Sequence, residues 1–167
     1  LHEEAKAGTV LKVAAPAGEF FLAERQERPV VLLSGGVGLT PMVAMLEALV
    51  ERDSDVPVHY IHGTHDRETH AMRGHIRLLA ENNRAVQIVD FHQTPLADEV
   101  QGLDYDEAGI ITDEWLVANT PVTAADYYIC GPRPFLRHAV STLSLAGVPS
   151  ERIHYEFFGP ADELLAA

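Results

Sequence analysis

A glycine-rich turn between an apolar run and a helical pattern is the stretch of this sequence best suited to chemistry. Residues 30–33 (VVLL) show no polar alternation, which is typical of a strand buried on both faces of a parallel sheet. Three glycines follow within residues 34–40 (SGGVGLT), and Pro41 suits the first helical position, where its missing N–H costs nothing. Such a turn brings backbone N–H groups and the positive end of a helix dipole to one point, which predicts a phosphate site.

The turn motif alone leaves an alternative open. It reads Gly36-x-Gly38-x-x-Pro41 and not G-x-G-x-x-G, the usual dinucleotide fingerprint. A tight strand-to-helix connection without a ligand is the alternative, because glycine turns punctuate many folds. The Thr40 hydroxyl has two compatible roles, as a donor to the ligand and as the N-cap of the helix.

Composition and charge exclude several classes of protein. The chain has 167 residues, of which 47% are hydrophobic, so it has room for one domain and part of another. The formal net charge of −13 argues against binding to nucleic acid or to an anionic membrane surface, and no apolar run is long enough to span a membrane. Cys130 is the only cysteine, which excludes an internal disulfide and predicts a cytoplasmic location.

From Pro29 onward the sequence alternates between strand and helix patterns. We expect strands at residues 30–34, 56–61, 86–91, 125–130 and 153–157. We expect helices at residues 41–50, 68–83 and 113–119, with Thr112 or Asp113 as a cap, and again after Pro132 as far as Gly147. A polar connection spans residues 93–108. This alternation predicts an α/β fold with a mostly parallel sheet, in which ligands bind beyond the carboxyl ends of the strands.

The first 28 residues have a different character. Short strand patterns occur at residues 9–15 and 19–22, and the polar residues 24–28 form a linker pattern. Two small strands cannot form an independent domain. We therefore expect either the tail of a β domain or a strand pair packed on the main domain. The predicted boundary separates residues 1–28 from residues 29–167.

Three carboxyl ends of the predicted strands, at residues 35–41, 130–132 and 156–160, are unusual. Together with residues 16–22 (PAGEFFL) they resemble the C-terminal reductase part of the flavohaemoglobins, or nitric oxide dioxygenases, within the ferredoxin–NADP reductase superfamily. The G-x-G-x-T-P and C-G-P motifs are typical of the superfamily. The segments PAGEFF and HYEFFGP are the more specific similarity to flavohaemoglobin.

The resemblance implies a parallel-sheet nucleotide-binding domain of the ferredoxin–NADP reductase type, preceded by a remnant of the β-barrel FAD domain. It implies an NAD(P)H-dependent oxidoreductase that passes hydride from NADH, or NADPH, to FAD for haem-based nitric oxide dioxygenation, which removes nitric oxide. The family's globin domain and its R-x-Y-S flavin segment are absent from this sequence. The expected partners are therefore the FAD domain and globin domain of the parent protein, haem belongs only to that parent, and this fragment by itself is expected to be inactive.

The same resemblance assigns roles to individual residues. Catalytic roles fall to Glu156, Cys130 and Thr40, with Glu156 linked to flavin and haem redox behaviour. The cofactor-binding residues would be Gly35, Gly36, Val37, Gly38, Leu39, Thr40 and Pro41 for the nucleotide, Cys130, Gly131 and Pro132 beside the nicotinamide, and Phe157, Phe158, Gly159 and Pro160 against the FAD.

Two of these residues have alternative interpretations. Cys130 is a compact wall, a buried structural cysteine or a nucleophile, although no histidine and aspartate partners are evident. Glu156 lies between two aromatic residues, and burial there would alter its pKa. The aromatic residues around it are otherwise ordinary core residues.

Nine histidines raise the question of a metal site. His59, His62 and His65 recur every three residues, and on a strand this spacing sends neighbours to opposite faces, so we expect no convergence and no metal. The ribose end of the nucleotide would follow the second strand, at residues 63–67. Arg67 there suits a 2′-phosphate and Asp66 a 2′-hydroxyl, and the resemblance favours NADH.

Two other functions remain open from the sequence. One is a reductase component of an oxygenase or a free-flavin reductase. The other is a non-catalytic, truncated module that binds a nucleotide without turnover, which the missing flavin motif favours.

Overall fold

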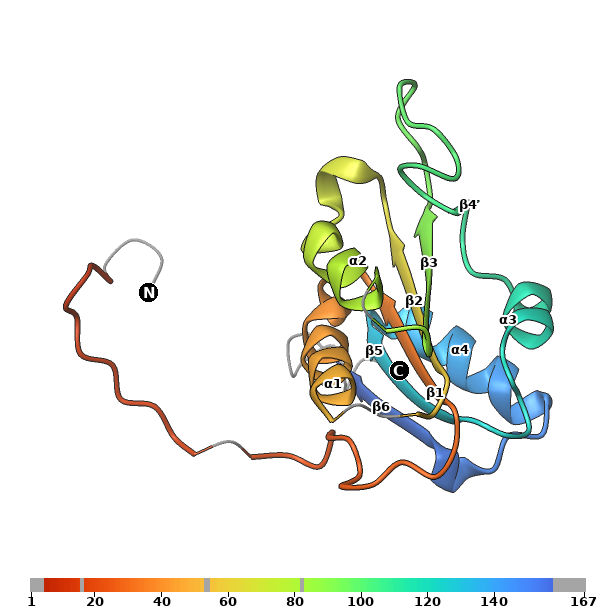
Figure 1. Cartoon of the computed structure of the whole chain (residues 1–167), viewed down its shortest axis with the longest axis horizontal. Coiled ribbons are helices and arrows are strands. Elements are labelled where there is room, and N and C mark those ends of the chain that lie inside the picture. The colour runs from red at the N-terminus through yellow and green to blue at the C-terminus, as the bar shows by residue number, and fades with distance from the viewer. Residues whose placement is uncertain (1–4, 16, 53–54, 82, 158–167) are drawn as a thin grey trace.

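The computed structural model describes residues 5–15, 17–52, 55–81 and 83–157, and shows one parallel sheet between two layers of helices (Figure 1). The strand order is β4-β3-β2-β1-β5-β6, and every pair is parallel. The strands are β1 Val30–Gly35, β2 Val58–Thr64, β3 Val86–His92, β4 Glu107–Ala108, β5 Asp126–Gly131 and β6 Ile153–Phe157. The predicted fold class is confirmed.

The central strand β1 separates two hydrophobic cores. All six of its residues are buried, as its unbroken apolar sequence predicts. Because side chains alternate across a strand, Val30 and Leu32 face one core, and Val31 and Leu33 face the other. Helices α1 Leu39–Glu51 and α2 Arg73–Glu81 cover the first face, and α3 Asp113–Asn119 and α4 Arg133–Leu145 cover the second (Figure 1).

Helix α3 begins as the sequence predicts. The Thr112 hydroxyl accepts a hydrogen bond from the backbone N–H of Trp115 at 3.2 Å, which makes Thr112 the N-cap. Asp113 and Glu114 in the first turn add negative charge near the positive end of the helix dipole.

The predicted helix at residues 68–83 begins too early. A short 3-10 turn, η2 (Arg67–Thr69), comes first, and α2 starts only at Arg73. The break is at Met72, whose φ of 58° lies in the left-handed region and cannot continue a right-handed helix. The aspartate Asp66 caps η2 by accepting a hydrogen bond from the Thr69 N–H at 3.0 Å.

Two other boundaries differ from the prediction. Strand β2 starts at Val58 and runs to Thr64, beyond the expected end at Ile61, because its pairing with β3 extends to His92. The connection at residues 93–108 contains the two-residue strand β4, and much of it projects beyond the end of β3 (Figure 1).

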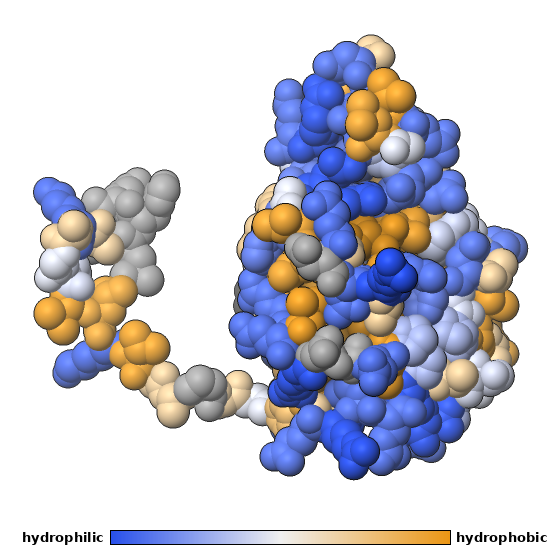
Figure 2. Space-filling model, in the orientation of Figure 1, coloured by the Kyte–Doolittle hydropathy of each residue, from blue (hydrophilic) through white to orange (hydrophobic). Residues whose placement is uncertain are grey.

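The expected strands at residues 9–15 and 19–22 do not form. None of the described residues between 5 and 28 belongs to a helix or strand. A strand needs a partner for its backbone groups, and this segment extends away from the sheet (Figure 1). Apolar residues in its first half are therefore exposed (Figure 2), Val10 to 92% and Val13 to 86%.

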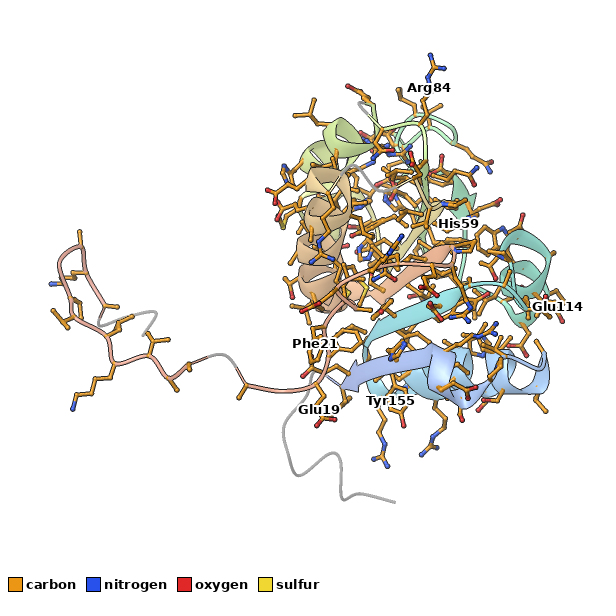
Figure 3. The ribbon with its side chains drawn as sticks, turned by 60° about the horizontal axis from the view of Figure 1, so that its bottom comes forward. Glu19, Phe21, His59, Arg84, Glu114 and Tyr155 are labelled. Atoms are coloured by element: carbon orange, nitrogen blue, oxygen red, sulfur yellow. The ribbon has the colours of Figure 1, made fainter. Side chains whose placement is uncertain are left out.

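The second half of this segment returns to the domain. Phe20 and Leu22 pack on the core beneath α1, and the Phe20 ring lies 6.2 Å from the Tyr128 ring. Arg52 at the end of α1 donates to the Ala23 carbonyl oxygen at 3.2 Å. Figure 3 shows Phe21 and Glu19 where the segment meets the domain, on the same side as Tyr155 of β6.

The turn after β1 packs directly against the end of β5. A Cβ at Gly38 would overlap the carbonyl group of Cys130 and lie 2.7 Å from the backbone nitrogen of Gly131. Only glycine permits this approach, so the turn and the strand are held together at this point.

The helices of the domain are too short or too polar for a lipid bilayer. Within the described part of the chain, none of them could cross a membrane.

Replacing Gly38 by alanine should destabilise the fold by at least about 3 kcal/mol, because the new methyl group collides with backbone that cannot move aside. Gly74→Ala is the matched control. Gly74 lies in α2 with no described atom within 4 Å of the position that a Cβ would take, so alanine there should add up to about 1 kcal/mol of stability. Urea unfolding midpoints measure both, and equal midpoints for Gly38→Ala and the wild type would contradict the contact.

Candidate functional site

A cavity of about 930 Å³ opens at the carboxyl ends of the strands, between the start of α1 and the start of α4. Its volume lies in the range of cofactor sites. Six of the predicted residues line it, together with residues from the ends of β2 and β3 and from α4. The lining residues are Gly35, Gly36, Val37, Leu39, Thr40, Gly63, Thr64, His65, Thr69, Ala71, Met72, Phe91, Gln93, Gly109, Ile110, Ile111, Pro132, Pro134, Phe135 and His138.

The turn at Gly36 and Val37 forms an open cradle. Gly36 has a φ of 53°, and no described atom lies within 4 Å of the position a Cβ would take. Val37 is 64% exposed on the same wall. The backbone of this turn is therefore accessible to a ligand, as close approach to a pyrophosphate requires.

The two helices that start at the cavity share one property. Among the described residues, no side chain caps α1 or α4, and neither has an acidic residue in its first turn. Helix α3, which starts elsewhere, has both Thr112 and two acids. The Leu39 N–H donates to the Gly36 and Val37 carbonyl oxygens, and Pro134 in α4 has no N–H, but a positive dipole end with no carboxylate beside it is suited to an anion at both helices.

Thr40 and Pro41 lie two positions deeper in the helix than the sequence suggests. Helix α1 begins at Leu39 with Gly38 as its N-cap, so the expected cap role of Thr40 is wrong. The Thr40 hydroxyl donates to the Val37 carbonyl oxygen at 3.3 Å and stays exposed at the cavity. Pro41 is the third helical residue, where its missing N–H is still harmless, and it does not line the cavity.

Several predicted residues lie behind the cavity wall or beside it. Gly38 and Gly131 form the contact between the turn and β5, and Cys130 is fully buried under α1. Glu156 and Phe157 are partly exposed at the end of β6 and are not among the lining residues. Phe158, Gly159 and Pro160 lie outside the described residues.

The environment of Cys130 favours a structural role. Burial raises the pKa of the thiol to about 11, with a smaller contribution from the Glu156 carboxylate on the neighbouring strand. The thiol therefore stays protonated at neutral pH, and a thiol in that state is a poor nucleophile. The interpretation of Cys130 as a buried structural cysteine fits this better than the compact wall or covalent catalysis.

Arg67 and Asp66, the two residues expected to bind the ribose end of the nucleotide, both form hydrogen bonds within the protein. Arg67 donates to Asp98 at 2.8 Å, and the pKa of Asp98 is lowered by that bond. Asp66 accepts the capping bond of η2. Of the predicted ribose segment, Gly63, Thr64 and His65 line the cavity, whereas Asp66 and Arg67 do not.

A chain of buried histidines lies behind the cavity and was not expected from the sequence. Ser34 Oγ lies 2.9 Å from His62 Nδ1, the His62 and His70 rings are 5.0 Å apart, and His70 Nδ1 lies 3.1 Å from His92 Nε2. His59 does face away from His62, but His62 converges with two histidines from other segments. The register of β2 and β3 could have indicated this convergence. Thr64 pairs with His92, and residues two apart on a strand share a face, so His62 and His92 lie on the same face of the sheet.

Two hydrogen bonds, Ser34 with His62 and His70 with His92, and a ring contact between His62 and His70 join these histidines. Within the described ranges no group of three or more histidine, cysteine, aspartate or glutamate side chains could hold a metal ion. Burial lowers the pKa of His62 to about 4 and of His70 to about 4, so both are neutral at pH 7. A neutral imidazole can donate from one nitrogen and accept at the other, which is compatible with the single bond that His62 and His70 each make through Nδ1.

Comparison with known proteins agrees with this geometry. Residues 32–141 match the oxidoreductase NAD-binding domain family. The chain belongs to this family. The glycine turn, the cavity and the C-G-P segment all fall within the matched residues, so the NAD-binding domain carries the candidate site.

The chain is similar along nearly its whole length to the flavohemoproteins of several bacteria. It is 53% identical to the flavohemoprotein of Xylella fastidiosa strain Temecula1 over 100% of this chain and 41% of that protein. It is 43% identical to that of Bacillus cereus strain ATCC 10987, over 98% of this chain and 41% of that protein. This chain thus spans about two fifths of the length of these relatives and matches their C-terminal part, so the predicted resemblance is confirmed.

A solved structure supports the same conclusion. The FAD/NAD-binding domain of nitric oxide dioxygenase from Vibrio cholerae superposes with a TM-score of 0.74 at 35% identity, over 87% of this chain and 57% of that chain. The NAD-binding domain is therefore the reductase-type part of the flavohemoprotein architecture.

Cys130 should resist alkylation in the folded protein, because the thiol is buried and protonated. Iodoacetamide at about pH 8 should modify the native chain far more slowly than the urea-unfolded chain. Since Cys130 is the only cysteine, mass spectrometry reads the site directly. Similar rates in both states would contradict the buried thiol.

Acid should destabilise the fold between pH 6.5 and pH 4. The pKa of His62 and of His70 is about 4 in the fold against an ordinary value of 6.5, so the unfolded chain binds more protons and stability falls as pH drops through this window. Urea midpoints across the window measure the loss. His62→Gln should make the urea midpoint depend less on pH, whereas His75→Gln, on the surface, should leave this dependence unchanged. Equal pH dependence of the midpoint in the two variants would contradict the lowered pKa of His62.

Proposed function

We propose that this chain binds NADH and presents it to FAD, as the nucleotide-binding part of a flavohemoprotein reductase that supplies electrons for nitric oxide dioxygenation. One observation carries the proposal: a cavity of about 930 Å³ lies between two helix starts that no described side chain caps. An anionic dinucleotide fits this arrangement. When bound, the nucleotide supplies the hydride.

The chain's own residues bind and orient the ligand. The Gly36–Val37 backbone and the first turn of α1 would hold the pyrophosphate, and Thr40 keeps its hydroxyl at the same wall. The ends of β2 and β3, with His65 and Gln93, would hold the ribose at the far side. Pro132 and Phe135 close the cavity beside α4, where the nicotinamide would be directed toward the flavin.

The domain boundary is part of this proposal. Residues 1–28 would be the end of an FAD domain, and residues 29–167 the NAD-binding domain. The exposed apolar residues Val10 and Val13 support it, because an extended segment with such side chains suits pairing with further strands. Glu156 and Phe157 would meet the flavin from β6, and a cytoplasmic location suits the single reduced cysteine.

A non-catalytic nucleotide-binding module is the second candidate. Binding of NADH without turnover would be its signature. Comparing NADH oxidation by this chain with and without added FAD separates the two, since sustained FAD-dependent oxidation would exclude the second candidate.

Val37→Glu should weaken NADH binding by at least about tenfold, or about 1.4 kcal/mol, because it places a carboxylate where the pyrophosphate would lie. Val37 is 64% exposed, so the fold should be unaffected. Val37→Gln is the control, equal in size but uncharged, and should bind within a few-fold of the wild type. Fluorescence titration measures both, and the charge effect should shrink with added salt.

Two results would contradict this site. Equal NADH affinity for Val37→Glu and Val37→Gln would remove the pyrophosphate from the turn. Absence of NADH binding by the wild type would leave the glycine turn as a structural connection only.

A further inference from the structure

One wall of the cavity is a short segment with a buried anchor. Thr69, Ala71 and Met72 line the cavity, whereas the His70 side chain between them points inward and is fully buried. Met72 holds a φ of 58°, a left-handed conformation that is unfavourable for a residue other than glycine. Strain of this kind persists only where the surroundings fix the backbone.

The surroundings that fix this segment converge on Glu99. His70 Nδ1 lies 3.1 Å from His92 Nε2, and His92 Nδ1 lies 2.7 Å from Glu99 Oε2. The other oxygen, Glu99 Oε1, accepts the backbone N–H of Arg67 at 2.5 Å. Glu99 therefore holds the segment at two places, directly at Arg67 and through His92 at His70.

The hydrogen bonds between His70, His92 and Glu99 all point toward Glu99. Burial works to raise the pKa of Glu99, but the bonds from His92 and the Arg67 backbone outweigh it, so the side chain is an ionised acceptor. His92 must then donate from Nδ1 and accept at Nε2, and His70 must donate from Nδ1. This leaves His70 Nε2 without a proton and without a hydrogen-bond partner among the described residues, 3.7 Å from Asp90 Oδ1.

Charged side chains face the neutral His70 from strand β3 and from helix α2. Asp90 faces it from β3, but Arg73 and Arg77 of α2 both bind Asp90 Oδ2, at 3.3 Å and 2.5 Å, and offset its charge. Within the described part of the chain, His62 of β2 and His92 of β3 are the remaining titratable neighbours. Burial is the main cause that keeps His70 neutral, and the two arginines offset the Asp90 charge that would favour the protonated form.

We propose that His70 is a positioning residue for the nucleotide site, which through its bond to His92 and Glu99 holds Thr69 to Met72 on the cavity wall. The inference rests on the proposed function, because it takes the cavity to bind NADH. The part of the cavity that His70 would affect is the end beyond β2, where the ribose would lie.

The test compares NADH titrations of His70→Leu, His70→Asn and His75→Leu. The leucine at position 70 removes the donor and should weaken binding by about tenfold, whereas asparagine retains a donor near the Nδ1 position and should restore most of the affinity. His75→Leu is the matched control, because His75 in α2 pairs with Glu47 at 2.7 Å on the surface and does not line the cavity. Equal affinity for all three variants would overturn the proposal.

Glu99→Gln provides a second test with a spectroscopic signature. A glutamine amide that accepts from Arg67 must donate to His92 Nδ1, so both imidazoles reverse and the His70 proton moves from Nδ1 to Nε2, toward Asp90. Nitrogen-15 spectra of labelled histidine report this exchange directly. We expect a protonated Nδ1 on His70 in the wild type and a protonated Nε2 in the variant, with a weaker affinity for NADH.

The possible failures are distinguishable. If His70→Leu does not fold, Glu99→Gln decides, and unchanged affinity together with an unchanged His70 tautomer would overturn the proposal. If the wild type binds NADH and the variants bind equally, the positioning role is wrong and the proposed function stands. If the wild type binds no NADH, the proposed function itself fails.

Discussion

The contact between Gly38 and the Cys130 carbonyl group is the constraint on which the site depends. It presses the turn after β1 against the end of β5, and α1 begins at that point. Helix α4 begins two residues beyond Gly131, on the other side of the same contact. Two helix starts therefore open to one cavity, and the positive ends of their dipoles reinforce each other there. Gly38 is therefore required for packing, whereas Gly36 forms the open turn that faces the ligand.

Much of the fold could be predicted from the sequence because the signals were local. The unbroken apolar run of β1, the Thr112 cap and the C-G-P turn each specify their own conformation without help from distant residues. The carboxyl ends of the strands then located the cavity. The predictions that were wrong concern segments whose conformation depends on other strands. The strands expected at residues 9–15 and 19–22 need neighbouring strands to pair with.

The site was harder to predict than the fold for the same reason. Met72 continues an apolar helical pattern, and only the tertiary anchoring of His70 shows why its backbone turns left-handed instead. The histidine chain joins β2, the segment after it and β3, so no spacing within one segment reveals it. The parallel register of β2 and β3 would have revealed half of it, since residues two apart share a face.

The loop between β3 and α3 also has a consequence for association between chains. Strand β4 pairs with only the last two residues of β3, but Asp106 extends the cover, because its carboxylate accepts the Asp90 N–H at 2.8 Å and its own N–H donates to the Asp90 carbonyl oxygen. The edge of β3 is thereby occupied near the cavity by groups that an incoming strand would have to displace. This part of the sheet edge therefore resists templated pairing with other chains, while the end of the sheet remains open to a small ligand.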